Sequence, residues 1–250
     1  MTAIPCLAVN EPYSVKNLTY ITEQFPPYNY QEGGKLQGIS VDFLEKMWNK
    51  MSVNLNESNI KLLSWTEGYR RTLNESNTVL FSTARLPQRE HLFKWVGPIG
   101  PIRNVLLAKK KDKILNISSA EDLKKYKIGA INDDSAVQML LDKGVKKQDL
   151  VLETASSQII EMLQNGSIEA WAYGDTAGIW QIQKSGANAS DFKVAYVLDQ
   201  IDYYYAFNKE TPESIVQSFQ QALDHIKSNK DKDGVTDYEK ILAKYIPAML

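Results

Sequence analysis

Two arginines stand four positions apart after a strongly apolar run in the segment FSTARLPQREHLFKWVGPI, residues 81–99. A guanidinium group is planar, permanently charged and able to bind a carboxylate through two parallel hydrogen bonds. The run TVLFSTA just before the arginines has the composition of a buried strand. Because ligands of α/β proteins collect at the ends of strands, we expect Arg89, which follows Pro87-Gln88, to bind an anionic group in a cleft.

A carboxylate and a hydroxyl group stand at comparable places in the second half of the chain. Asp175 ends the strand-like run IEAWAYGD, and Ser135 begins a helical segment after KIGAI, where backbone N–H groups favour an anion. A fixed anion facing a fixed cation across a cleft would suit a zwitterion. Each residue also has a purely structural interpretation, since Arg89 could pair with Glu90 and Asp175 could cap the next helix. The residues alone leave these alternatives open.

Motifs of common enzymes and metal sites are missing from the sequence. The chain has two histidines and one cysteine, without HExxH, CxxC, GxSxG, GxGxxG or P-loop motifs. We therefore expect no catalytic residue, no metal site and no cofactor. Residues 229–240 resemble a calcium loop, but Lys240 stands where a bidentate glutamate belongs, so we interpret the segment as a turn between two helices.

Composition limits the class of protein further. With 250 residues, 43% of them apolar, the chain can form one large domain or two smaller ones. A net charge of -1 argues against a nucleic-acid partner, and no apolar run reaches the ~18 residues of a spanning helix. The start MTAIPCLAVN does not resemble a signal peptide, although a chain beginning after a removed leader would look the same. Cys6 has no second cysteine to pair with.

The sequence contains more N-x-S/T glycosylation triplets than chance combination of these residue types would give. Together with the binding-site pattern, they favour a periplasmic or cell-surface location, outside the cytoplasm. The triplets begin at Asn17, Asn56, Asn74, Asn116, Asn165 and Asn188.

Strand and helix patterns alternate along the chain, which indicates an α/β fold. Residues 39–51 have the spacing of an amphipathic helix, and residues 213–229 and 237–246 read as two final helices. After residue 105 the alternation begins again, with a capping-box start at Ser118 and strand-like runs at FKVAYVL and YYYAFNK. This restart predicts two lobes.

Four segments in order carry a resemblance to a known family. They are FPPYNYQEGGKLQGISVDFLEKM, SWTEGYRRTL with VLFSTARLPQREHLFKWVGPI, KIGAINDDSAVQML, and GSIEAWAYGDTAGIW. From about Leu18 to Ile246 the chain resembles the extracytoplasmic solute-binding proteins of polar amino-acid ABC transporters. This resemblance implies the two-lobed type II periplasmic binding fold, with a ligand cleft between lobes joined by two hinge strands.

The resemblance also implies roles for particular residues. Arg89 would bind the α-carboxylate of an amino acid, and Ser135 with the backbone of Ala136 would donate hydrogen bonds to it. Ser82 would offer a backbone carbonyl to the α-ammonium group, and Asp175 a carboxylate to the same group.

Apolar walls and one weaker candidate complete the implied site. Phe25 or Tyr28, together with Trp65, would cover the ligand. Arg85 ranks second among the arginines because its side chain should alternate away from the cleft. Ala84 replaces a threonine that is usual before the arginine, which removes one hydroxyl contact.

The sequence departs from the family's pattern at two further places, which bear on the identity of the ligand and not on the fold. Leu86 replaces a second threonine, and NDDS at 132–135 stands where a glycine-rich turn is common and adds negative charge near the expected carboxylate site. We expect lobe 1 to comprise residues 1–103 and 203–250 and lobe 2 residues 104–202, with hinges near Ile102 and Gln200.

The expected function is capture of a small molecule, an amino acid, by a monomer that delivers it to an ABC transporter permease. Two alternatives use the same fold. One is the outer sensory domain of a membrane receptor. The other, weaker, is an enzyme resembling cyclohexadienyl dehydratase, for which Glu90, Glu169 and His91 would be the nearby proton donors or acceptors.

Overall fold

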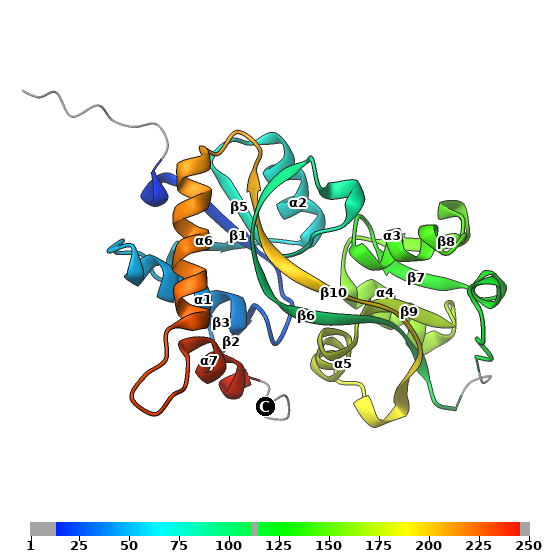
Figure 1. The fold of residues 1–250 in the computed structure, drawn as a ribbon. Coiled ribbons are helices and arrows are strands. Elements are labelled where there is room, and N and C mark those ends of the chain that lie inside the picture. The colour runs from blue at the N-terminus through cyan, green and yellow to red at the C-terminus, as the bar shows by residue number, and fades with distance from the viewer. Residues whose placement is uncertain (1–13, 112–114, 246–250) are drawn as a thin grey trace, which may run out of the picture.

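Two long antiparallel strands, β6 (Phe93–Lys109) and β10 (Phe192–Asn208), run through both halves of the molecule and join them. The computed structural model describes residues 14–111 and 115–245. Figure 1 shows one group of helices and strands at each end of this strand pair. The fold is therefore two-lobed, as the sequence predicts, and a single sheet of order β4-β1-β5-β10-β6-β9-β7-β8 connects the lobes.

Lobe 1 combines the first part of the chain with its last helices. Its strands besides the joining pair are β1 (Thr19–Thr22), β2 (Tyr30–Glu32), β3 (Lys35–Gln37), β4 (Ile60–Leu62) and β5 (Thr78–Ala84). Its helices are α1 (Ile39–Lys50), α2 (Trp65–Asn74), α6 (Glu213–Ser228) and α7 (Asp237–Tyr245). Strands β1, β4 and β5 are parallel, so their carboxyl ends meet at one edge, which faces lobe 2.

Lobe 2 is built from the middle of the chain around the other ends of β6 and β10. Its strands are β7 (Ile128–Ile131), β8 (Leu150–Glu153) and β9 (Ala170–Gly174), and its helices are α3 (Ser135–Asp142), α4 (Ser156–Asn165) and α5 (Asp175–Lys184). These three strands are parallel as well. The loops that follow them lie opposite the strand ends of lobe 1.

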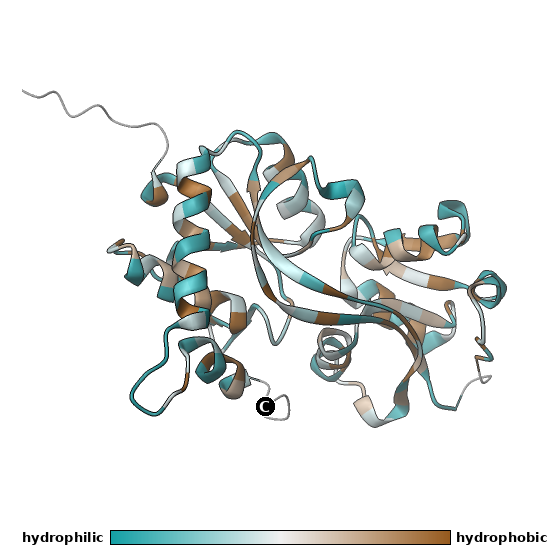
Figure 2. Ribbon diagram, in the orientation of Figure 1, coloured by the Kyte–Doolittle hydropathy of each residue, from teal (hydrophilic) through white to brown (hydrophobic). Residues whose placement is uncertain are grey.

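Apolar periodicity explains how the helices pack. In α1 the residues Val41, Leu44, Met47 and Trp48 are buried, as their helical spacing predicts. Helix α6 shows the same pattern, and in Figure 2 its ribbon alternates between hydrophobic and hydrophilic colours. Strands β5, β7 and β9 are buried along their whole length because helices cover both faces.

Three local predictions need correction. The runs FKVAYVL and YYYAFNK form one strand, β10, and not two. The capping box starts one residue later than predicted, at Ser119 with Asp122, and opens a 3-10 turn. Met51 lies directly after α1, as its C-cap, and is only partly buried.

The segment that resembles a calcium loop is a turn before α7. Lys240, placed where a calcium ligand would be needed, forms an ion pair with Asp231 at 2.5 Å. Among the described residues there is no cluster of metal-ligating side chains, and none of the helices is long and apolar enough to cross a membrane.

Candidate ligand-binding site

The end of β5 has an irregular backbone at the edge that faces lobe 2. Ser82 has a φ of +61°, a left-handed conformation that is uncommon for residues other than glycine. The partner strand β10 shifts register opposite it, between Tyr204 and Tyr205. The Ser82 hydroxyl group bonds to Ser40 Oγ at 2.8 Å and to Asn29 Oδ1. Backbone strain of this kind gathers at functional sites.

Arg89 lies buried in the cleft, with only 6% of the residue exposed. The turn Pro87–Arg89 carries it, and its guanidinium group stacks 5.5 Å from the ring centre of Trp65 and 5.1 Å from that of Tyr69. Its Nη2 donates to the backbone carbonyl of Asp133 in lobe 2 at 2.6 Å. Among the described residues it forms no ion pair with a carboxylate, so the alternative interpretation, a surface pair with Glu90, does not hold.

Arg85 lies in a different environment. It is exposed, forms an ion pair with Glu90 (Nε to Oε2, 2.8 Å), and stacks on Trp95 and Tyr204. Ala84, next to it in the chain, is buried, and its carbonyl accepts a 3.4 Å bond from Arg89 Nη1. The two arginines therefore lie in different surroundings, Arg85 directly after the end of β5 and Arg89 in the turn Pro87–Arg89 that follows it.

Lobe 2 presents a helix start to the cleft. Asp134 caps α3 by accepting a 2.8 Å bond from the backbone N–H of Ala136, which is therefore already occupied. Ser135, the first residue of α3, accepts a 3.5 Å bond from Asn104 on β6. Burial raises the pKa of Asp134 to about 6, although the bond from Ala136 and the charge of Arg89 oppose this shift.

A second carboxyl group, Glu23, comes from the loop after β1. Burial raises its pKa well above the usual value, and the like charge of Asp134 adds to the shift. Burial also raises the pKa values of Tyr173 and Tyr203, and the charges of Glu23 and Asp134 act in the same direction. These four groups from both lobes thus lie near enough to interact.

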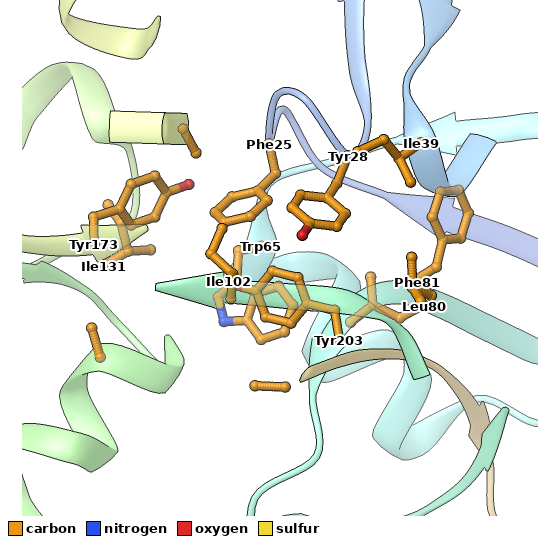
Figure 3. Close-up of a cluster of buried hydrophobic side chains, with 14 of the residues drawn as sticks. Phe25, Tyr28, Ile39, Trp65, Leu80, Phe81, Ile102, Ile131, Tyr173 and Tyr203 are labelled. Carbon is orange, nitrogen blue, oxygen red and sulfur yellow. The ribbon is translucent and has the colours of Figure 1, made fainter. Parts of the chain in front are cut away.

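An aromatic cluster separates the cleft into two parts. Figure 3 shows Phe25 between Tyr173 of lobe 2 and Tyr28 of lobe 1. The Phe25 ring centre lies 5.4 Å from those of Tyr173 and Tyr203 and 6.2 Å from that of Tyr28. Tyr28 also donates a 2.5 Å bond to the carbonyl of Pro101 on β6, so it ties the loop to a joining strand.

Asp175 lies in the other part of the cleft. It begins α5 and accepts bonds from Arg103 Nε at 2.8 Å and from its neighbour Thr176 at 2.6 Å. It lines a cavity of about 280 Å³ with Tyr28 and Gln200. The structure therefore brings Trp65, Ala84, Arg89, Ser135 and Ala136 to one region and Asp175 to another, and the role predicted for Asp175 stays a prediction.

Sequence reasoning missed Glu23, Asp134, Tyr173 and Tyr203. Glu23 has a signal similar to that of Arg89, since it follows a buried strand. Asp134 stands out in the sequence only as added negative charge in NDDS. The tyrosines belong to strand segments and have no motif, so only the fold reveals that they face the cleft.

Two lobes of parallel strands, joined by a strand pair and enclosing a cleft of polar and aromatic side chains, define a two-lobed binding protein. The chain belongs to the bacterial extracellular solute-binding proteins, family 3, whose model matches residues 18–248. The family predicted from the four sequence segments is thereby confirmed.

Individual relatives agree with this assignment. A probable amino-acid-binding protein, YxeM, of Bacillus subtilis (strain 168) is 24% identical over 228 residues, covering 90% of this chain and 81% of YxeM. A histidine kinase sensor domain with similarity to periplasmic binding proteins has a TM-score of 0.76 at 18% identity, covering 92% of this chain and 97% of that domain. An ancestral arginine-binding protein bound to glutamine has a TM-score of 0.75 at 20% identity, covering 93% and 99%. The two structures are similar to this chain in fold.

Proposed function

We propose that this chain captures an amino acid between its lobes, outside the cytoplasm, and delivers it to an ABC transporter permease. The observation that carries the proposal is Arg89, a buried guanidinium group in the cleft that has no carboxylate partner among the described residues. A ligand carboxylate would replace the two carbonyl acceptors of Arg89, those of Ala84 and Asp133, with a charge-assisted, two-point contact. The family's description as extracellular and the name of YxeM, a probable amino-acid-binding protein, support the same function.

Capture requires the lobes to move. Lobe 1, residues 1–103 and 203–250, and lobe 2, residues 104–202, would rotate about β6 and β10 near Ile102 and Gln200. A ligand that touches both lobes stabilises the closed form by its additional contacts there. A permease would recognise the closed form of the monomer.

A thermal-shift screen with amino acids, amines and small carboxylates tests the proposal. A ligand that binds only the native state adds about 2.7 kcal/mol of stability at a hundredfold excess over Kd. We expect at least one α-amino acid to raise the melting temperature. If only ligands without an α-carboxylate did so, the proposed role of Arg89 would be wrong.

A sensory role is the second candidate, because the histidine kinase sensor domain has the same fold over 92% of this chain. Both functions need the same cleft, so the binding screen does not separate them. The gene does: a reading frame that continues into a membrane-spanning segment and a signalling domain would favour sensing. A neighbouring permease gene would favour transport.

We also propose that the chain is not an enzyme. Glu90 is engaged by Arg85, and the Glu169 carboxylate accepts a 2.9 Å bond from the backbone of Lys127, away from the cleft. Glu23 and Asp134 do lie in the cleft with raised pKa values, so turnover needs a direct test. Prolonged incubation with the ligand found in the screen, followed by NMR, should return the ligand unchanged.

A further inference from the structure

One interlobe cavity contains a single ionisable side chain. The cavity has a volume of about 270 Å³, and its walls come from loops of both lobes, among them Trp65, Ile131 and Ser156. Glu23 is the only charged residue in its lining. Since a water molecule's share of liquid volume is about 30 Å³, the space holds a group of several heavy atoms.

The charge around this cavity is unbalanced. The charge of Asp134 disfavours ionisation of Glu23. Arg89, whose charge acts on Asp134, is engaged by the Asp133 carbonyl and two aromatic rings. Glu23 itself is partly buried and has a like charge acting on it. A cation beside it would offset both the desolvation penalty and the like-charge repulsion.

Three buried polar atoms near the ends of the strands have no hydrogen-bond partner among the described residues. Asn104 Oδ1 and Thr22 Oγ1 are buried and have no hydrogen-bond partner, and both can accept a bond from a donor such as an ammonium group. Trp65 Nε1 is buried without a partner as well. Figure 3 shows this nitrogen on the side of the indole ring that faces Ile131 of lobe 2, and both residues line the cavity.

The polar groups of the cleft form one set of hydrogen-bond donors and one set of acceptors. Trp65 Nε1 and Arg89 are donors next to one another, and they suit a carboxylate. Glu23, Asp134 and Asn104 are acceptors, and they suit a donor with positive charge. An acidic end group would add a third negative charge there, and an uncharged amide would leave the carboxylates uncompensated.

We propose that Glu23 determines the charge of the ligand, and that the cavity it lines takes a guanidinium or ammonium end group. Asp134 reinforces this preference from lobe 2. The inference rests on the proposed function, because it assumes a ligand whose carboxylate is held at Arg89. It narrows that ligand to a cationic amino acid.

The test compares ligands of matched shape. Titration calorimetry of the wild type with L-arginine and with L-citrulline, which has an uncharged urea group, measures the effect of the charge; L-lysine and L-norleucine form a second pair. We expect at least one cation to bind tenfold or more tightly than its uncharged counterpart. Glu23→Gln should reduce that preference to less than threefold.

Two controls separate recognition from folding. Glu67→Gln removes an exposed carboxylate that pairs with Arg70 in α2, and it should leave the preference unchanged. Glu23→Gln should not lower the melting temperature of the unliganded protein, because burial and Asp134 already push the Glu23 carboxyl group toward its neutral form, which glutamine resembles. A purely structural Glu23 would instead lower it.

Several outcomes would overturn the inference. The first is that arginine binds no better than citrulline and lysine no better than norleucine. The second is that neither arginine nor lysine binds. The third is that Glu23→Gln keeps the preference of the wild type for the cation. If an uncharged or acidic amino acid binds and Arg89→Ala abolishes that binding, the proposed function stands and this inference fails. If no amino acid binds, both fail.

Discussion

At the scale of single residues, the cleft contains ionisable groups that form no ion pair among the described residues. Arg89 is buried and donates hydrogen bonds to backbone carbonyls, and Glu23 and Asp134 are carboxyl groups that burial pushes toward their protonated forms. A protein that only needed stability would gain by replacing such groups with apolar ones. Their presence together is most simply explained by a ligand that supplies the missing charges.

The raised pKa of Asp134 makes a prediction about pH. Its ordinary value is 3.8 and its folded value about 6, so the folded state keeps the proton longer than the unfolded state does. Between these values the stability of the unliganded protein therefore falls as pH rises, by about 3 kcal/mol from this group. The pKa of Glu23 is raised as well, whereas the charge of Arg89 opposes the rise in the pKa of Asp134.

Asp134→Asn isolates this effect, because asparagine caps a helix as well as aspartate does. Urea unfolding at pH 4 and pH 7 should show that the variant loses less stability over this range than the wild type. Identical pH profiles of the two proteins would mean that Asp134 titrates normally.

Asp175→Asn tests the role that the family resemblance assigns to Asp175. If Asp175 binds the ligand's ammonium group, affinity should fall at least about tenfold, the 1.4 kcal/mol scale of one charged contact. The structure offers a competing role, the partly exposed pair with Arg103, whose loss costs at most about 1 kcal/mol of folding stability. If Asp175→Asn bound the ligand as tightly as the wild type in titration calorimetry, Asp175 would not be a ligand-binding residue.

At the scale of elements, the strand-end rule located much of the site from sequence. Arg89 and Ser135 follow or open elements where α/β proteins bind ligands, and both lie at the cleft. The partners of these residues were beyond sequence reasoning. Arg103 and Asp175 meet across 72 positions of the chain, and only the pairing of β6 with β9 brings them together.

The long joining strand β10 shows a second limit of prediction from sequence patterns. Polar residues at Asp199, Gln200 and Asp202 interrupt the apolar pattern of β10, so the sequence suggests two strands. These residues are exposed where the strand crosses between the lobes, since helices do not cover it there. Pattern alone cannot distinguish such an exposed crossing from a loop.

Contacts between β2 and α5 hold the lobes together at one rim of the cleft. Lys184 of α5 forms a 2.7 Å ion pair with Glu32 of β2 and stacks on Trp180, whose ring faces Tyr30 at 5.8 Å. These groups belong to different lobes, so they stabilise the closed form without touching the cavity that Glu23 lines.

Glu32→Gln should therefore weaken ligand binding without unfolding either lobe. An exposed pair contributes at most about 1 kcal/mol, which corresponds to a loss of affinity of up to about fivefold. Glu121→Gln, which removes an exposed pair with Lys124 inside lobe 2, is the matched control. Tighter binding by Glu32→Gln in titration calorimetry would show that the contact does not favour closure.

At the scale of the whole molecule, two lobes joined by only two strands predict a hinge. Solution scattering should give a smaller radius of gyration with saturating ligand than without, because the ligand closes the lobes. The measurement should use the ligand identified in the thermal-shift screen. An unchanged scattering profile at saturation would contradict closure, although binding itself could still occur.

The central claim is that a ligand carboxylate is bound by Arg89 between the lobes. Removing a charged partner inside a desolvated cleft costs roughly 2–5 kcal/mol of binding free energy. Because Arg89→Ala also deprives two backbone carbonyls of their donor, Arg89→Lys serves as a second variant that keeps the charge but loses the planar fork. Arg85→Ala is the control and should lose much less affinity.

The most direct test is titration calorimetry of wild type, Arg89→Ala, Arg89→Lys and Arg85→Ala with the amino acid found in the screen. The account predicts one site in the wild type, a loss of at least about thirtyfold in Arg89→Ala, the lower bound of 2 kcal/mol, and a clear loss in Arg89→Lys. Binding by a folded Arg89→Ala within threefold of the wild type would contradict it.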